Sequence, residues 1–538
     1  MAPHNMLLVF SLAAASMLLL RLFRSLVLLP WRAATKAKAL GCGAVPMQPS
    51  SLPLGIGTVL DFLRNDRAQR APDYLVETFA AIGSYTFRFQ ALGYTHFFTA
   101  EPRNMQALLA TQFNDFVIAP DRRNSFRSVT GSGIFVKDGA AWHSARDLMR
   151  PMFVRETVSD LALLESHVQK LLACIETPGG GVNEDGWTAP TSLGRLFPCL
   201  TMDSSTELFM GRSTHSLDAR LRGDQEHHDF RWALERSQSI LHTRLRLQSL
   251  YWLYARGETK KCKAIMHAFV DKAIDAAEDA RAQRKDTGSR YDYLDMLRRQ
   301  PECVGDRNKL REEVLSLLAA GRNTTAAMMS WVFYCLIRHP RVWEKLRAEV
   351  LSDFGPYSAD TSTTLDAITF QKLKGCSYLQ HVMNETLRVH SVVLFNLRMA
   401  VRDTTLPTGG GEDGTKPVFV PKGTTVMFSP HVMHLRKDLW GEDADQFRPE
   451  RWEGARLGWN YLPFNGGPRI CLGQQFALTM AGYVVVRLLQ RYDAIEGLDV
   501  DPARDYHHFA LSCSPGTPDG DGAAVKCRLR VAKTTAAA

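Results

Sequence analysis

The long apolar stretch at residues 311–339 constrains the fold more than any other feature of the chain. It has the length and composition of a helix, and Pro340, which cannot continue a helical hydrogen-bond ladder, marks its end. Apolar side chains occur almost all round this predicted helix, and a helix of that kind is normally buried. We therefore expect it to cross the middle of a molecule large enough to enclose it.

Helical patterns also dominate the rest of the chain. Two further helices are expected at about 372–390 and 472–492. Strand-forming residues occur in a few short segments around Gly-containing turns, which predict two hairpins: 84–90 with 94–99, and 418–421 with 424–429. The expected fold class is mainly α with small β-sheets.

The N-terminal segment indicates a membrane anchor. Residues 6–20 carry no formal charge, and Arg21 and Arg24 could snorkel and so extend the apolar span to about twenty residues. These basic residues follow the apolar run, whereas those of a cleaved signal peptide precede it. Because cytoplasmic flanks carry an excess of Lys and Arg, we expect a single-pass anchor with the remainder of the chain in the cytosol.

Composition suggests how the chain is organised after the anchor. We expect an anchor at 1–30, a linker rich in Pro and Gly at 31–57, and one catalytic domain at 58–538. The net charge of +9 is partly concentrated beside the N-terminal apolar run, so it does not indicate a nucleic-acid partner.

The ten cysteines are widely spaced, and no two have the C-x-x-C spacing of zinc and redox sites. A disulfide framework is therefore not expected, which agrees with a reducing compartment. Cys471 differs from the others in its surroundings. It lies in FNGGPRICLG, between loop-forming residues and the predicted helix at 472–492.

This segment fits the pattern F-x-x-G-x-R-x-C-x-G at every fixed position: Phe464, Gly467, Arg469, Cys471 and Gly473. In this respect the chain resembles the cytochrome P-450 superfamily of haem-thiolate monooxygenases, and the resemblance extends over most of its length. The resemblance implies that Cys471 is the axial ligand of a haem iron. A thiolate donates electron density to that iron and favours O–O bond cleavage.

The neighbours of Cys471 take their implied roles from the same resemblance. Arg469 would pair with a haem propionate, and Phe464 would cover the proximal face of the porphyrin. Gly467 and Gly473 would let the backbone turn and approach the porphyrin closely. The helix start after Cys471 would stabilise the negative charge of the sulfur.

Two more motifs match the family. Glu385 and Arg388 lie three apart on a predicted helix and can pair, as an ordinary surface pair would. The resemblance implies that they join Arg451 in a buried network that supports the cysteine loop. Trp142 and Arg146 match a W-x-x-x-R helix whose side chains reach one propionate, although a core Trp and a surface Arg would have the same spacing.

Two single residues correspond to further positions around the haem. Arg398 corresponds to another propionate partner, and His434 lies at a position that is often close to the haem edge.

The segment AAGRNTT, within the helix at 311–339, resembles A-G-x-[DE]-T-[TS]. Small residues such as Ala320 would leave room for O₂ and substrate, and Thr324 would hold water for proton delivery. Alternatively, the Thr324 hydroxyl bonds only a carbonyl one turn back. Asn323 occupies the usual acid position, and its amide can order water but cannot ionise.

The segments that line the distal pocket in this family are apolar here: Ile134, Phe135, Ala320, Val393, Leu394, Phe395 and Leu511. An apolar substrate is implied, although apolar residues are the default in any protein interior. Several longer segments look like the fungal branch that hydroxylates n-alkanes and fatty acids at or near the terminal carbon. The segment RVHSVVLFNLR departs from that branch, which usually has a Pro-rich version.

The sequence therefore predicts a monooxygenase of the endoplasmic reticulum membrane that contains haem b. Its implied partners are NADPH-cytochrome P-450 reductase, which passes on electrons from NADPH, cytochrome b5 as an optional donor, the membrane, and a lipophilic substrate. Two alternatives stay open. One is a haem-thiolate isomerase or dehydratase that does not use O₂, which Asn323 favours, and the other is a non-enzymatic, membrane-tethered haem sensor.

Overall fold

The computed structural model of the 538-residue chain describes residues 16, 29–153, 160–177, 181–222, 229–283, 293–300, 303–499, 501, 504–520 and 524–533. The predicted anchor at 1–30 lies almost entirely outside this part of the chain. Within the described ranges, no helix combines the length and apolar character that a bilayer crossing requires. Helix α2 (Leu29–Ala39) occupies the start of the segment predicted as a linker.

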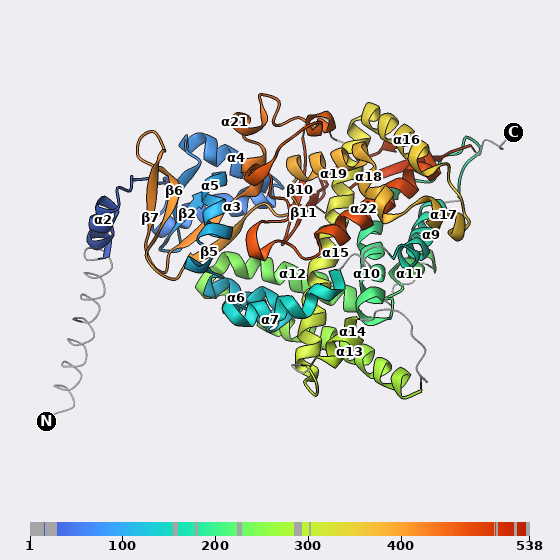
Figure 1. Cartoon of the computed structure of the whole chain (residues 1–538), viewed down its shortest axis with the longest axis horizontal. Coiled ribbons are helices and arrows are strands. Elements are labelled where there is room, and N and C mark those ends of the chain that lie inside the picture. Colours follow the sequence, from blue (N-terminus) through green and yellow to red (C-terminus); the bar gives the residue numbers. More distant parts are fainter. Residues whose placement is uncertain are drawn as a thin grey trace. The chain divides into compact units, whose positions relative to one another are not determined.

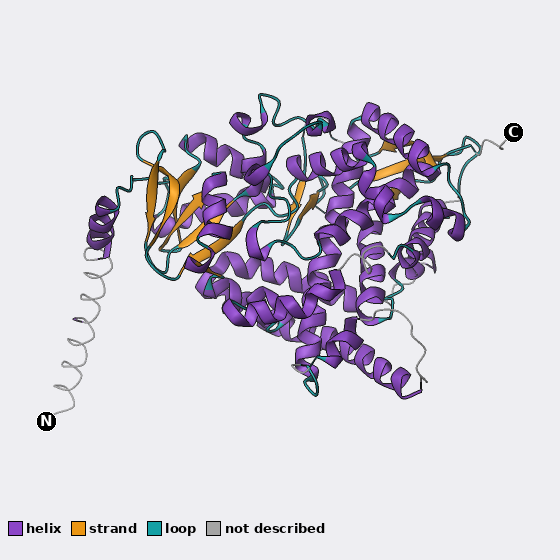
Figure 2. Cartoon of the chain, in the orientation of Figure 1, coloured by secondary structure: helices purple, strands orange, loops and turns teal. Residues whose placement is uncertain are grey.

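The predicted fold class is confirmed, because helices make up most of the described chain and the sheets are small (Figure 2). The chain forms two compact units. Unit 1 comprises Met1–Thr58, Thr78–Val117 and Leu397–Phe428, and unit 2 comprises Val59–Glu77, Ile118–Asn396 and Ser429–Ala538.

Unit 1 contains most of a five-stranded sheet with the order β1-β2-β8-β5-β3. The predicted hairpin at 84–99 is confirmed as the antiparallel pair β1 and β2, and β8 lies parallel to β2. The strands are β1 (Thr86–Ala91), β2 (Tyr94–Thr99), β3 (Phe116–Val117), β5 (Asn396–Ala400) and β8 (Thr425–Phe428). Helix α5 (Pro102–Gln106) also lies in unit 1, while α3 (Ile56–Arg67) and α4 (Ala71–Ile82) run across the boundary between the units.

The second predicted hairpin is wrong. Strand β7 (Lys416–Val420) pairs with β6 (Thr404–Gly410) and not with β8. A turn does follow β7, and the Thr424 N–H donates to Pro421 O at 3.1 Å. Thr424 and Gly423 then bond to Ala400 at the end of β5, so the chain leaves the turn into the other sheet.

Unit 2 holds the other helices and the remaining strands. Its helices are α6 (Pro120–Thr130), α7 (Gly139–Met149), α9 (Ala162–Glu176), α10 (Leu193–Met210), α11 (Ser216–Arg222), α12 (Asp229–Leu247), α13 (Arg256–Gln283), α14 (Tyr293–Arg299), α15 (Arg307–Arg338), α16 (Pro340–Phe354), α17 (Thr361–Ala367), α18 (Phe370–Gly375), α19 (Ser377–Val389), α20 (Pro430–His434), α21 (Lys437–Trp440) and α22 (Gln474–Arg491). Its strands are β4 (Thr191–Ser192), β9 (Tyr492–Gly497), β10 (His507–Phe509), β11 (Cys513–Pro515) and β12 (Lys526–Val531), which form the sheets β4-β12-β9 and β10-β11.

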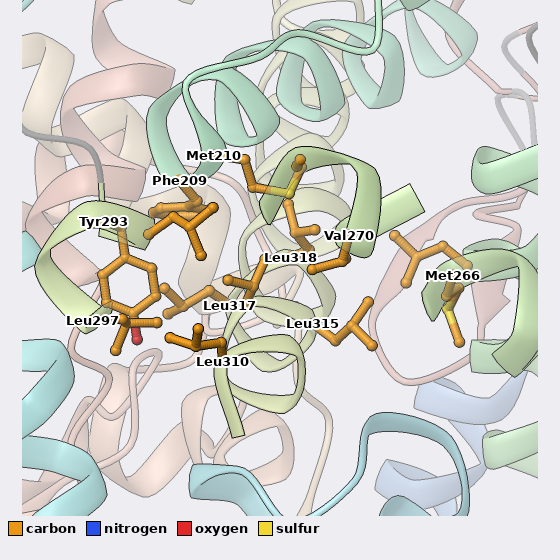
Figure 3. Packing of buried hydrophobic residues seen from close by; sticks show 14 of the residues in the cluster. Phe209, Met210, Met266, Val270, Tyr293, Leu297, Leu310, Leu315, Leu317 and Leu318 are labelled. Atoms are coloured by element: carbon orange, nitrogen blue, oxygen red, sulfur yellow. The ribbon is translucent and has the colours of Figure 1, made fainter. Parts of the chain in front are cut away.

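Helix α15 is the long buried helix that the sequence predicts. The side chain of Asp306 caps its start by accepting from the Lys309 N–H at 3.0 Å, and Pro340 follows its end. In unit 2, α15 packs against α10, α13, α14, α19 and α22 (Figure 1). Its leucines enter a core that is shared with α10, α13 and α14, where Figure 3 shows Leu315, Leu317 and Leu318 among side chains such as Phe209 and Val270. The first half of α15 is therefore anchored in this core.

Candidate active site

The loop before α22 presents Cys471. Gly467 has a φ of 67°, a left-handed conformation that favours glycine, and the turn that begins there closes with the Ile470 N–H donating to Gly467 O at 3.0 Å. The Cys471 N–H donates to Phe464 O at 3.0 Å, so the two ends of the motif are joined. Gly473 immediately precedes the first residue of α22.

Cys471 is the exposed cysteine of the chain, whereas eight others are buried and Cys42 is half-buried. Packed atoms around the sulfur raise the pKa of the Cys471 thiol, while the Gly473 N–H and the charge of Arg146 act in the opposite direction. Because the desolvation of the sulfur by these packed atoms prevails, although the residue as a whole is exposed, a thiolate at this position needs a further positive charge, such as a coordinated metal ion provides. The donor therefore fits an iron ligand.

Three predicted residues meet beside the cysteine loop. Trp142 on α7 is buried, and the guanidinium carbons of Arg469 and Arg146 lie 4.3 and 5.6 Å from the centroid of its ring. Arg146 Nη1 donates to Ile470 O at 3.0 Å, and Arg469 Nη2 donates to Asp138 Oδ1 at 2.7 Å. The structure thus joins the W-x-x-x-R helix to the loop that carries Cys471.

A further arginine, Arg122 on α6, belongs to this group and was not predicted from the sequence. Burial lowers the pKa of Arg122 to about 10, and the like charge of Arg469 acts in the same direction. Burial also lowers the pKa of Arg469 to about 10, although Asp138 opposes that shift. Among the described residues, Arg469 and Arg123 both pair with the same carboxylate, that of Asp138. An anionic ligand would relieve this crowding of positive charge, so the arginines fit the propionates of a haem.

The residues around Cys471 therefore fit an iron porphyrin. Cys471 would hold the iron, and Arg469, Arg146 and Arg122, together with Trp142, would hold the carboxylates of the group. When bound, the haem supplies the activation of O₂, and the chain supplies binding, orientation and electrostatics.

Glu385 lies at the centre of a buried polar network. Its carboxylate accepts from Arg388 Nε at 2.8 Å, from Arg451 Nε at 2.8 Å and from Trp452 Nε1 at 2.9 Å. The side chains of Glu385 and Arg388 are fully buried, and that of Arg451 is nearly so. Charges at this depth persist only when they are paired and hydrogen-bonded, as these are.

His434 connects this network to the cysteine loop. Arg388 Nη1 donates to His434 O at 2.8 Å, and His434 Nε2 accepts from the Leu462 N–H at 2.9 Å, two residues before Phe464. Burial lowers the pKa of His434 well below its ordinary value, so the ring is neutral and can accept. The position of His434 at the haem edge stays a prediction.

Arg398 lies on β5 in unit 1. Its guanidinium carbon lies 5.8 Å from the centroid of the Phe428 ring, and Nη1 donates to Leu397 O at 2.8 Å. Its assignment to a propionate stays a prediction.

Thr324 and Asn323 lie at the centre of α15, where both are half-buried. Thr324 Oγ1 donates to Ala320 O at 2.6 Å. The hydroxyl hydrogen is therefore used by the carbonyl one turn back, while the hydroxyl oxygen can still accept a hydrogen bond. Asn323 Nδ2 donates to Gln238 Oε1 on α12. The sequence carries no signal for this partner, which lies 85 residues away.

The apolar residues predicted for the distal pocket all belong to unit 2, where the structure gives them different neighbours. Ile134 and Leu511 pack against the large core cluster that includes the leucines of α15. Phe395 packs edge-on against Phe62 and Phe509, with ring centroids 6.2 and 5.8 Å away. Of the remaining four predicted residues, Phe135 packs against Phe126. Leu394 is buried, and Val393 and Ala320 are half-buried.

A thiol loop joined to a basic, Trp-containing helix, in a unit that also contains a long buried helix with a small-residue segment, is the arrangement of a haem-thiolate protein. Comparison with known proteins agrees. The profile of the family described as Cytochrome P450 matches residues 47–516. The chain belongs to the cytochrome P450 family and is a haem-thiolate monooxygenase that works with a redox partner.

Several curated proteins are similar over nearly their whole length. Cytochrome P450 monooxygenase alt2 of Alternaria solani is 56% identical over 97% of this chain and 98% of its own. Cytochrome P450 monooxygenase g430 of Fusarium sp is 43% identical over 90% of this chain and 85% of its own. Cytochrome P450 52A3-B of Candida maltosa is 39% identical over 86% of this chain and 88% of its own.

Proposed function

We propose that this monooxygenase hydroxylates a fatty acid, an n-alkane or a similar lipophilic metabolite at a C–H bond. The observation that carries the proposal is the cluster of the aromatic rings of Phe62, Phe395 and Phe509, whose centroids lie 5.8 to 6.4 Å apart. Aromatic side chains offer a large apolar surface without hydrogen-bond donors or acceptors, which suits a hydrocarbon chain. The resemblance to the fungal branch that hydroxylates alkanes and fatty acids supports the same substrate class.

The chain's own residues would divide the work in the proposed reaction. The aromatic cluster would orient the substrate and exclude water, and Thr324 and Asn323 would hold water on the reacting side of α15. Cys471 and the arginines would hold the haem. Glu385, Arg388 and Arg451 would keep the cysteine loop in place.

We also propose where the enzyme works and with which partner. Residues 1–30 would anchor it in the endoplasmic reticulum membrane, with residues 31–57 as a linker and the catalytic domain at 58–538 in the cytosol. NADPH-cytochrome P-450 reductase would then deliver the electrons on the same side of the membrane, with cytochrome b5 as an optional second donor.

The test is a titration of the purified haem protein with saturated fatty acids and with n-alkanes of increasing length. We expect a change in the haem absorption spectrum whose midpoint falls as the chain lengthens, because each buried methylene contributes about 0.8 kcal/mol. Products formed with NADPH, reductase and O₂ are then identified by mass spectrometry. No spectral response across both series would contradict the lipid substrate class, and product formed without O₂ would favour the isomerase or dehydratase alternative.

A further inference from the structure

Helix α15 has the amide of Asn323 at the position where the related motif has a carboxyl group. A monooxygenase converts RH, O₂, NADPH and a proton into ROH, water and NADP⁺, so two protons enter the water that is formed at each turnover. These protons must cross the protein interior. Asn323 cannot release or take up a proton at ordinary pH, and Thr324 already donates its hydrogen to Ala320 O at 2.6 Å. A group on another element is needed.

Helix α12 supplies a carboxyl group next to this segment. Arg322 and Asn323, which are adjacent on α15, contact Glu235 and Gln238, which lie three apart on one face of α12. Arg322 Nη2 lies 2.5 Å from Glu235 Oε1, and Asn323 Nδ2 donates to Gln238 Oε1. Gln238 Nε2 in turn donates to Ala319 O at 3.3 Å, so its amide is fixed at both ends.

The Glu235–Arg322 pair connects solvent with the interior. The Glu235 side chain is 48% exposed, whereas that of Arg322 is 1% exposed. The charged groups that face the Glu235 carboxylate are Arg322 on α15 and Arg231 on α12, whose Nε lies 3.8 Å away. Glu235 can therefore exchange protons with bulk water while it touches a residue next to Asn323.

Within the part of the chain that the structure describes, buried polar atoms without a protein partner occur on Arg322 itself and beside its neighbour Gly321. Nε and Nη1 of Arg322 and Oγ of Ser205 on α10 are buried without a hydrogen-bond partner among the described residues. Ser205 Oγ lies 3.6 Å from the position that a Cβ at Gly321 would occupy. Buried polar atoms that lack a protein partner are normally bonded to ordered water. Arg322 Nε and Nη1 belong to the residue next to Asn323, so water bonded to them would lie beside the proposed route, whereas Ser205 Oγ lies beside Gly321 on the side of α15 that faces α10.

We propose that Glu235 is the proton-supplying group of this enzyme and takes the role that Asn323 cannot perform. Glu235 passes a proton to water held by Arg322, Asn323 and Gln238, and is reprotonated from bulk solvent. Asn323 and Gln238 are positioning residues, since they orient this water and do not ionise. The inference rests on the proposed role of the Asn323–Thr324 segment.

The decisive variant is Glu235→Gln, which keeps the side-chain shape and removes the ability to take up and release a proton. We expect product formed per NADPH to fall and hydrogen peroxide release to rise. We also expect kcat to fall by about ten- to a hundredfold, because general acid catalysis typically contributes at least that much and bulk water replaces it only in part. The solvent isotope effect on kcat should increase, and the substrate-induced spectral change should stay the same.

The matched control is Glu258→Gln. Glu258 on α13 is 37% exposed and binds Arg236 of α12 with two hydrogen bonds of 2.7 and 2.8 Å. It is a glutamate of similar exposure that also holds α12, and the structure gives it no contact with residues 322 and 323. We expect its coupling and isotope effect to match those of the unaltered enzyme. If Glu235→Gln behaves like Glu258→Gln, the inference is overturned.

A rescue variant separates proton supply from a structural role. Asn323→Asp restores a carboxyl group on α15, so the double variant Glu235→Gln/Asn323→Asp should recover most of the lost coupling. If the double variant is no better than Glu235→Gln, Glu235 acts only through packing and the inference fails.

A crystal structure of the haem-bound enzyme gives a readout that does not depend on turnover. We expect ordered water on Arg322 Nε or Nη1, and an Arg322 side chain without ordered water would overturn the inference. This readout holds even if no lipid is accepted, so failure of the proposed substrate class and failure of the proton route can be distinguished.

Discussion

At the scale of single residues, Cys471 is the residue proposed to hold the haem iron, and its side chain contributes little to the fold. Cys471 is exposed, and the hydrogen bond from its backbone N–H to Phe464 O does not involve the sulfur. We expect Cys471→Ala to fold but to lose the spectrum of thiolate-ligated haem when the reduced protein is mixed with carbon monoxide. Cys42→Ala in unit 1 should leave that spectrum unchanged. Circular dichroism checks the fold of both variants, and an unchanged carbon monoxide spectrum for Cys471→Ala would contradict the assignment.

The Glu385 network gives a second prediction at this scale. Glu385→Gln leaves Arg388, which is fully buried, and Arg451, which is 5% exposed, without their shared negative charge. Breaking a buried pair in this way typically costs about 3–5 kcal/mol. Urea unfolding of the haem-bound protein measures the loss. Glu442→Gln is the control, because its pair with Lys437 is 92% and 60% exposed and contributes about 0–1 kcal/mol. Equal small losses for the two variants would show that the network does not stabilise the fold.

At the scale of elements, the packing of α15 makes a testable contribution. Leu318 is fully buried in the cluster that α15 shares with α10, α13 and α14. Figure 3 shows Leu318 packed among neighbouring apolar side chains of this cluster. We expect Leu318→Ala to lower the free energy of unfolding by about 2–5 kcal/mol, since surrounding structure relaxes only partly around such a cavity. Val304→Ala, just before α15, should change it by less than about 0.5 kcal/mol because Val304 is 67% exposed. A loss for Leu318→Ala as small as that for Val304→Ala would mean that this part of the core is loosely packed.

Sequence patterns predicted elements and motifs whose signals are local. The helix at 311–339 and the Cys471 motif depend on periodicity and on fixed spacings, and both correspond to compact features of unit 2. The second hairpin was wrong because a turn signal does not reveal which strand each arm will join, and β8 pairs with β2 from a distant part of the chain. Arg122 was missed because two adjacent arginines on a helix usually mark a solvated surface. Only the tertiary structure brings such residues to the site.

At the scale of the whole molecule, several histidines are buried in unit 2. Burial lowers the pKa of His390 to about 4, and those of His431 and His507 to about 3. They come from the end of α19, from α20 and from β10, and the His390 ring stacks on Trp331 with centroids 4.0 Å apart. The native state therefore keeps these rings neutral where an unfolded chain would protonate them.

This difference predicts a loss of stability in acid. An unfolded histidine has a pKa of about 6.5, so below that pH the unfolded state binds more protons than the native state and stability falls as pH falls. Each such histidine lowers the free energy of unfolding by about 1.4 kcal/mol per pH unit below about 6.5, until the pH approaches its native pKa. Burial raises the pKa of Asp73 to about 6, and this carboxyl acts in the opposite direction between about pH 6 and 4.

The pKa is lowered for seven described histidines, at positions 167, 242, 267, 390, 431, 434 and 507, and raised for four described carboxyls, Asp73, Asp121, Glu313 and Asp499. Because the histidines outnumber the carboxyls, we expect the urea midpoint of the haem-bound protein to fall between pH 7 and pH 5. His431→Gln isolates the contribution of one ring, since it keeps a polar side chain on α20 and removes the titrating group. Its free energy of unfolding should fall less steeply with acid than that of the unaltered protein, by about 1.4 kcal/mol per pH unit. His143→Gln on α7 is the control because its residue is exposed. If His431→Gln and His143→Gln retain the same steepness, the buried histidines do not set the acid limit, and the groups responsible lie elsewhere in the molecule.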